Sequence, residues 1–277
     1  MNYKTKNPDQ FRSQFNEVKK ELSRLLGVEL NKKSVIKSPI EFAVKLINDL
    51  DNQHQNYKRD IELDILRFFT MQLKRLEDHN DKVFKKFKYK LKKINNLDNY
   101  YGLRFELNIA STLVKNCIDF DKTESPDFTL KGDNKTHYIE CTGSRLTTDN
   151  KKDDYLYKIS SAIRKKIEKE YCDNNAALFI DITNIAWNRT VRKTYKSKKF
   201  EIDKNEYKDF ISNLELENNF GNYTLFCYII NTDLDRIQSS YIRIDMYDIS
   251  DDLLSFMNKC FPISDEKIDI PIYLHEG

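Results

Sequence analysis

Two acidic residues in one short stretch of the chain, Ser125 to Ser144, have the spacing of a carboxylate pair. Asp127 begins the first predicted strand of this stretch, and Glu140 lies inside an apolar run, Tyr-Ile-Glu-Cys. Gly132 opens a turn signal, Gly-Asp-Asn, so we expect a β-hairpin with one acid on each strand. A buried carboxylate is costly unless it is paired, protonated or bound to a metal. The hairpin is therefore the candidate functional site.

The second strand of the hairpin sets the direction of its side chains. Because strand side chains alternate between two faces, Tyr138, Glu140 and Thr142 are expected on one face, and Ile139 and Cys141 on the other. Two carboxylates on adjacent strands make an oxygen-only site, which suits Mg²⁺ or Mn²⁺ better than Zn²⁺. The alternative is an ordinary hairpin with solvated acids, since motifs this short also occur by chance.

The pattern Pro-Asp, then Glu-x-Thr about a dozen residues later, resembles the PD-(D/E)XK motif of restriction-endonuclease-like nucleases. The resemblance implies that Asp127 and Glu140 bind Mg²⁺ or Mn²⁺, helped by the backbone carbonyl of Cys141. Thr142 stands where the family has a lysine, and it can hydrogen-bond water or phosphate but carries no charge. Some members take this lysine from the following helix, and Lys166 is the candidate. Alternatively, a helix this rich in lysine places one at the core edge anyway.

A helix predicted from Asn99 to about Lys115 precedes a short strand predicted from Cys117 to Phe120. In restriction-endonuclease-like folds the helix before the first core strand often offers an acid toward the metal site. The resemblance assigns that role to Glu106, which would hold a second ion or a metal-bound water. The alternative is an exposed helix acid, or one paired with a basic residue one turn away.

The order of elements after the hairpin supports the same fold. We expect a helix from about Asp154 to Tyr171, with Lys166 at the edge of its apolar face. The run from Ala176 to Thr183 is nearly all apolar, which is typical of a strand buried on both faces. The resulting β-β-β-α-β order is that of the restriction-endonuclease-like core. Further elements are expected at 204–214 (helix), 223–231 and 240–247 (strands) and 251–259 (helix).

The first part of the chain shows helical periodicity alone. Phe11, Phe15, Val18, Leu22 and Leu25 recur at spacings of three and four, and three more stripes of this kind follow. We therefore predict an all-α N-terminal domain over residues 1–96. Residues 97–277 are predicted to form an α/β domain, a restriction-endonuclease-like mixed sheet flanked by helices.

Two basic stretches are candidates for contact with nucleic acid. One is a predicted loop at 187–200, where aromatic residues stand among the cations, as in surfaces that stack bases. The other is the predicted helix at 81–95. Alternatives are a disordered surface loop and a solvated helix face. The candidate contacts are Arg189, Arg192, Lys193, Lys196, Lys85 and Lys86.

Composition excludes several other classes of protein. The formal net charge is +3, so the whole-chain balance permits a nucleic-acid partner without requiring one. The five cysteines are odd in number and include no CxxC pair, which argues against a disulfide framework or a structural zinc site. Phosphate-loop, dinucleotide-binding and nucleophile-elbow motifs are absent. No apolar stretch has signal-peptide or membrane-span length, so a soluble cytoplasmic protein without a membrane partner is expected.

Together these features predict a Mg²⁺-dependent endonuclease that acts on DNA, and the resemblance implies a bacterial defence or mobile-element system. Two alternatives stay open. In the first, the α/β domain has lost catalysis with its lysine and serves as a nucleic-acid-binding or protein-interaction module. In the second, the helical N-terminal domain is a partner-binding bundle and the acids are incidental.

Overall fold

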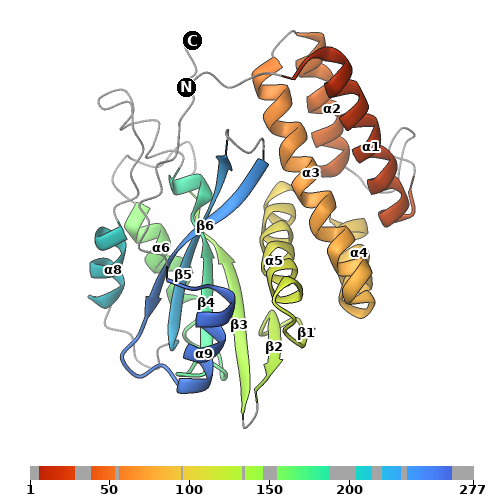
Figure 1. Cartoon of the computed structure of the whole chain (residues 1–277). Helices are drawn as coiled ribbons and strands as arrows, with labels where there is room; N and C mark the ends of the chain where they lie inside the picture. Colours follow the sequence, from red (N-terminus) through yellow and green to blue (C-terminus); the bar gives the residue numbers. More distant parts are fainter. Residues whose placement is uncertain are drawn as a thin grey trace. The chain divides into compact units, whose positions relative to one another are not determined.

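The structure, a computed structural model, describes residues 6–28, 39–53, 56–94, 96–132, 135–145, 155–186, 204–213, 220–231 and 236–263. As predicted, it is an α/β structure, with an open six-stranded mixed sheet flanked by helices (Figure 1). The chain groups into two compact units, here called the helical unit (Met1–Cys117 with Ile230–Ile237) and the α/β unit (Ile118–Ile229 with Gln238–Gly277). The domains predicted for residues 1–96 and 97–277 stay predictions.

Five helices follow one another in the described part of the helical unit. Side-chain caps mark where several of them begin: Asn7, Asn80 and Asn96 each accept a backbone N–H of the first turn. The first helix ends at Gly27, whose φ of 69° suits glycine because it has no Cβ. The helices are α1 (Pro8–Leu26), α2 (Pro39–Asn52), α3 (Asn56–His79), α4 (Asp81–Lys93) and α5 (Leu97–Lys115).

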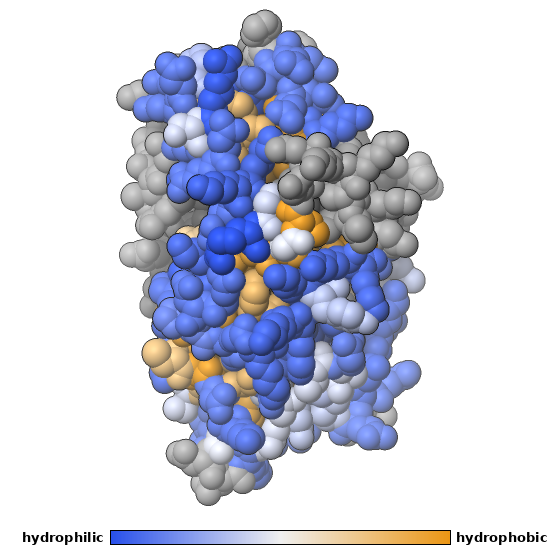
Figure 2. All heavy atoms as spheres, turned by 90° about the vertical axis from the view of Figure 1, so that its right-hand side faces the viewer, coloured by the Kyte–Doolittle hydropathy of each residue, from blue (hydrophilic) through white to orange (hydrophobic). Residues whose placement is uncertain are grey.

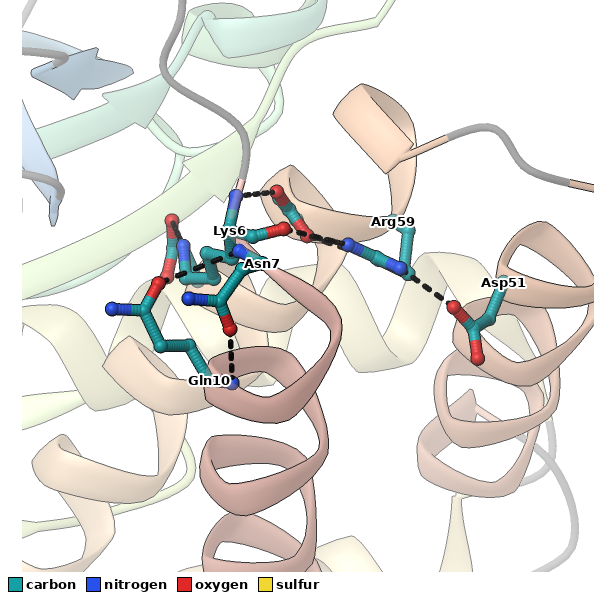
Figure 3. A network of polar contacts seen from close by, with 7 residues as sticks. Lys6, Asn7, Gln10, Asp51 and Arg59 are labelled. Atoms are coloured by element: carbon teal, nitrogen blue, oxygen red, sulfur yellow. Dashed lines mark hydrogen bonds and ion pairs between the residues drawn. The ribbon is translucent and has the colours of Figure 1, made fainter.

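A buried ionic network ties the start of α1 to α2 and α3 (Figure 3). Arg59 donates to Asp60 at 2.9 Å and to Asp51 at 2.6 Å, and its guanidinium lies 3.9 Å from the centre of the Phe11 ring. The Lys6 backbone N–H donates to the other Asp60 oxygen at 2.7 Å. Because Arg59 and Asp60 are buried, the pair stabilises this arrangement only while both partners are present.

The α/β unit is built around the sheet. Its strands are β1 (Phe120–Lys122), β2 (Phe128–Lys131), β3 (Thr136–Gly143), β4 (Ala176–Asp181), β5 (Asn222–Asn231) and β6 (Arg236–Asp245), adjacent in this order. β2 is antiparallel to β1 and β3, whereas β3, β4 and β5 are parallel. Helices of this unit include α6 (Tyr155–Arg164), α8 (Lys204–Ser212) and α9 (Asp251–Cys260), and residues 183–186 are also helical.

Apolar side chains cover both faces of the central strands. On one face, Ile159 of α6 and Ile211 of α8 share a core with Leu178 of β4. On the other, Phe179 of β4 packs edge-on against Phe261, which directly follows α9, with ring centroids 5.0 Å apart. The six residues of β4 are all buried, as predicted for a central strand.

The first strand starts three residues later, and ends two residues later, than the predicted Cys117 to Phe120. After α5 the chain makes a turn in which Cys117 adopts a φ of 54°, in the left-handed region that cannot extend a strand. The strand therefore starts at Phe120 and includes Lys122. Because of this shift, the Lys122 side chain lies in phase with Phe120 and is buried.

Polar residues dominate much of the surface. Figure 2 shows the face turned toward the right-hand side of Figure 1, and hydrophilic side chains predominate on it. This agrees with helices that bury one side only, as α4 does with Val83, Phe84, Phe87 and Leu91. Among the described helices, none has the length and apolar character needed to cross a membrane.

Candidate functional site

The two acids of the hairpin are brought together by the register of β2 and β3. Phe128 pairs with Ile139, so one further step along the antiparallel pair sets Asp127 opposite Glu140. The Asp127 side chain lies against the peptide that follows Glu140, because its Oδ2 accepts the backbone N–H of Cys141 at 2.8 Å. Both acids are buried, and Glu140 is only 3 % exposed.

Asp127 is held by two donors from its own unit. Its Oδ1 accepts the Lys122 ammonium at 2.9 Å, and its Oδ2 accepts Cys141 N–H. The Lys122 side chain is 1 % exposed and also donates to the carbonyl of Thr123 at 3.0 Å. This lysine therefore neutralises Asp127 from inside the fold.

Glu140 has a different pair of partners. Lys166 donates to Oε1, and the Tyr171 hydroxyl donates to Oε2 at 2.6 Å. The Tyr171 oxygen also lies 3.2 Å from Ser125 Oγ, which joins the loop before Asp127 to the same group. Burial first, and then the bond to Glu140, raises the pKa of the Tyr171 hydroxyl, so this phenol is protonated near neutral pH and acts as the donor.

Lys166 reaches Glu140 from a different local structure than predicted. The helix α6 ends at Arg164 rather than near Tyr171, and the chain continues in tight turns, with Lys166 N–H donating to Ile163 O at 2.8 Å. In a regular α-helix, residues five apart are roughly 140° apart around the axis. Lys166 and Tyr171 could not both reach one carboxylate from such a helix, so these contacts favour the turns despite a helix-forming sequence.

The donor set fits a hard divalent cation. Asp127 and Glu140 offer carboxylate oxygens, and the Cys141 carbonyl faces the same side of β3 as its N–H, toward Asp127. Mg²⁺ is commonly bound through one or two carboxylates with water and substrate phosphate completing its shell. In the described part of the chain, no group of three or more His, Cys, Asp or Glu is arranged to hold a metal. A cation at this place would have two carboxylates from the chain and would need water or substrate oxygens to complete its shell.

The other predicted site residues lie elsewhere or outside the described residues. Thr142 is half-buried on β3, two residues beyond Glu140 and so on the same face. Glu106 lies on α5 in the helical unit, and its role at a metal stays a prediction. On α4, Lys85 is exposed and pairs with Asp81, while Lys86 is half-buried. Arg189, Arg192, Lys193 and Lys196 lie outside the described residues.

Sequence reasoning missed Lys122, Tyr171 and Ser125. The signal for Lys122 was available, because Phe120 and Lys122 alternate with Asp121, and a lysine in phase with a buried phenylalanine points inward. Tyr171 was assigned to the end of a helix, and the early end of α6 carries no strong sequence signal.

Comparisons with protein-family models, with curated proteins and with solved structures found no significant match to this chain.

The Tyr171 hydrogen bond to Glu140 is expected to contribute to stability. Tyr171→Phe removes the donor to the buried Glu140, and we expect the free energy of unfolding to fall by about 1–2 kcal/mol. Tyr157→Phe is the matched control, because Tyr157 is 63 % exposed and a change there should stay within about 0.5 kcal/mol. Urea denaturation followed by circular dichroism measures both. Equal stability of the two variants would contradict the assigned bond.

Because the folded chain raises the pKa of Tyr171, this contribution is fully present below the ordinary tyrosine pKa. It is lost only as the pH rises through the raised value. The difference between wild type and Tyr171→Phe is therefore expected to be constant from neutral pH to about pH 9.

Proposed function

We propose that the α/β unit is a metal-dependent nuclease that hydrolyses phosphodiester bonds, with DNA as the substrate, and that its sheet is of the restriction-endonuclease-like type. The observation that carries the proposal is the approach of Lys166 to Glu140. Lys166 places a positive charge beside the acid pair, whereas Thr142 carries no charge. The antiparallel β1-β2-β3 segment, followed by α6 and the parallel strand β4, is the order expected for such a fold.

Each residue of the site has a role that its contacts allow. Asp127 and Glu140 would hold Mg²⁺ or Mn²⁺ together with the Cys141 carbonyl. When bound, such an ion polarises the scissile phosphate and lowers the pKa of a bound water. Tyr171 fixes the second oxygen of Glu140. The Lys166 side chain is 24 % exposed, so its ammonium can move away from Glu140 and donate instead to a phosphate oxygen or to the attacking water.

We propose that Lys85, Lys86 and the basic residues of the 187–200 stretch contact the phosphate backbone of the nucleic acid. Their contribution to affinity would be independent of sequence and would fall as salt is added. The setting that the resemblance implies, a bacterial defence or mobile-element system in the cytoplasm, is part of the proposal.

A binding module without catalysis is the second candidate. It is favoured by one specific observation: both oxygens of Asp127 already have partners from the chain, Lys122 and Cys141 N–H. A carboxylate satisfied in this way is stable without a metal. Nucleic-acid binding that is independent of Mg²⁺, without cleavage, would favour this function.

The test is cleavage of plasmid and single-stranded DNA by wild type and Lys166→Met with Mg²⁺ or Mn²⁺. Loss of the Lys166 charge is expected to lower the rate by about 10²-fold or more, as for removal of one transition-state donor. Lys165→Met is the control, because Lys165 is exposed in the same turn and its loss changes net charge equally. Equal rates for the two variants would remove Lys166 from the mechanism. No cleavage by wild type would leave the binding module.

A further inference from the structure

Lys122 is a buried lysine to which the proposed mechanism gives no part. Its ammonium lies 2.9 Å from Asp127 Oδ1 and 5.0 Å from the centre of the Phe128 ring. With a side chain 1 % exposed, it has no direct access to water or to a substrate phosphate. A buried ammonium persists only with a close counter-charge, so its position depends on Asp127.

The formal charges around the acid pair balance. Asp127 and Glu140 carry two negative charges, and their partners Lys122 and Lys166 carry two positive charges. The affinity of oxygen sites for divalent cations depends strongly on the number of ligand charges. A cation placed on Asp127 would also be repelled by the ammonium that already shares this carboxylate.

We propose that Lys122 is an internal competitor of the divalent ion at Asp127, which keeps the metal affinity of the free protein low. A phosphate group brings further negative charge and offsets the two lysines, so metal and nucleic acid bind cooperatively. The inference rests on the proposed metal site, but it concerns binding and not cleavage. Lys122 is in this sense a positioning residue, since it acts through Asp127.

The test measures Mn²⁺ bound to the full-length chain by electron paramagnetic resonance of the free ion. Wild type without nucleic acid is expected to bind Mn²⁺ weakly. Lys122→Gln keeps a hydrogen-bond donor for Asp127 but removes the charge, and is expected to lower the Kd for Mn²⁺ by about tenfold or more. Lys131→Met, an exposed lysine of β2, is the control for net charge and should match wild type.

The direction in which the Kd for Mn²⁺ changes in Lys122→Gln distinguishes competition with the metal from a purely structural role of Lys122. Loss of a merely structural lysine would weaken Mn²⁺ binding or leave it unchanged, and either result in Lys122→Gln overturns the proposal. The double variant Lys122→Gln/Asp127→Asn should lose the gained affinity, which assigns the ion to Asp127. If Lys122→Gln does not fold in the absence of metal, Mn²⁺ is expected to restore a cooperative thermal unfolding transition. The absence of such a transition with Mn²⁺ would contradict the proposal.

To test whether metal and nucleic acid bind cooperatively, the Mn²⁺ titration is repeated with a short oligonucleotide. A sample of oligonucleotide and Mn²⁺ without protein is the blank. It should lower the Kd for Mn²⁺ in wild type more than in Lys122→Gln, and an equal effect would overturn this part. The results also distinguish the two proposals. Tighter Mn²⁺ binding by Lys122→Gln without cleavage by wild type would contradict the nuclease alone. Cleavage by wild type without tighter binding would contradict the role of Lys122 alone.

Discussion

Glu140→Gln is expected to reduce the rate of the proposed DNA cleavage by about 10³-fold or more, because it removes a proposed metal ligand worth several kcal/mol of transition-state stabilisation. The substitution keeps the shape of the side chain and an oxygen for the Tyr171 hydroxyl, which donates at 2.6 Å. Lys166 loses its ionic partner, but its side chain is 24 % exposed and can turn to solvent. The fold should therefore persist.

Fluorescent plasmid-nicking and oligonucleotide assays measure the rate, and gel-shift titration measures binding. Glu168→Gln is the matched control, because Glu168 is an exposed acid in the same segment, between Lys166 and Tyr171. DNA binding by Glu140→Gln should equal or exceed that of wild type, since a negative charge is removed. Cleavage by Glu140→Gln at the rate of Glu168→Gln would exclude Glu140 from catalysis.

Arg59→Met is expected to lower the free energy of unfolding of the helical unit by about 3–5 kcal/mol, because it leaves a buried charge without its partner. Asp60 is 0 % exposed and accepts two bonds from Arg59, at 2.9 and 3.0 Å. Asp51 loses its partner at 2.6 Å (Figure 3). The contact of the guanidinium with the Phe11 ring also disappears. The backbone N–H of Lys6 would remain on Asp60 but carries no charge.

Guanidinium denaturation followed by far-ultraviolet circular dichroism measures this loss, with the helical signal reported separately if two transitions occur. Arg24→Met is the control: Arg24 also bonds two acids, Glu21 and Glu77, but its side chain is 51 % exposed. We expect Arg24→Met to lower the free energy of unfolding by only about 0–1 kcal/mol. Arg59→Met/Asp60→Asn should recover part of the loss, since the buried charge is gone. Equal losses for Arg59→Met and Arg24→Met would contradict the argument.

Local patterns in the sequence were enough to predict most elements. The recurrence of Phe11, Phe15, Val18, Leu22 and Leu25 at spacings of three and four predicted the helix that the structure has as α1. The period-two geometry of a strand gave the face of Glu140, and the turn signal at Gly132 set it on the strand next to Asp127. These signals act over a few residues and depend little on the rest of the fold.

Tertiary contacts decided the features that sequence reasoning missed. The segment from Lys165 to Tyr171 has strong helix formers, yet two of its side chains converge on Glu140 and the helix ends before them. Lys122 lay beyond the predicted first strand, because the turn at Cys117 delays the start of β1 by three residues. The approach of Lys166 and Tyr171 to Glu140 could not be read from spacing, since it joins residues that only the folded chain brings together.

Cleavage of single-stranded and duplex DNA by the wild-type chain, with Mg²⁺ or Mn²⁺ and with a chelator, would test the proposed metal-dependent nuclease itself. Asp127 and Glu140 lie together beside Lys166 in the fold. We expect cleavage that requires the metal, stops with the chelator and is lost in Glu140→Gln. Metal-independent cleavage, or none by well-folded wild type on DNA or RNA, would contradict the proposed nuclease.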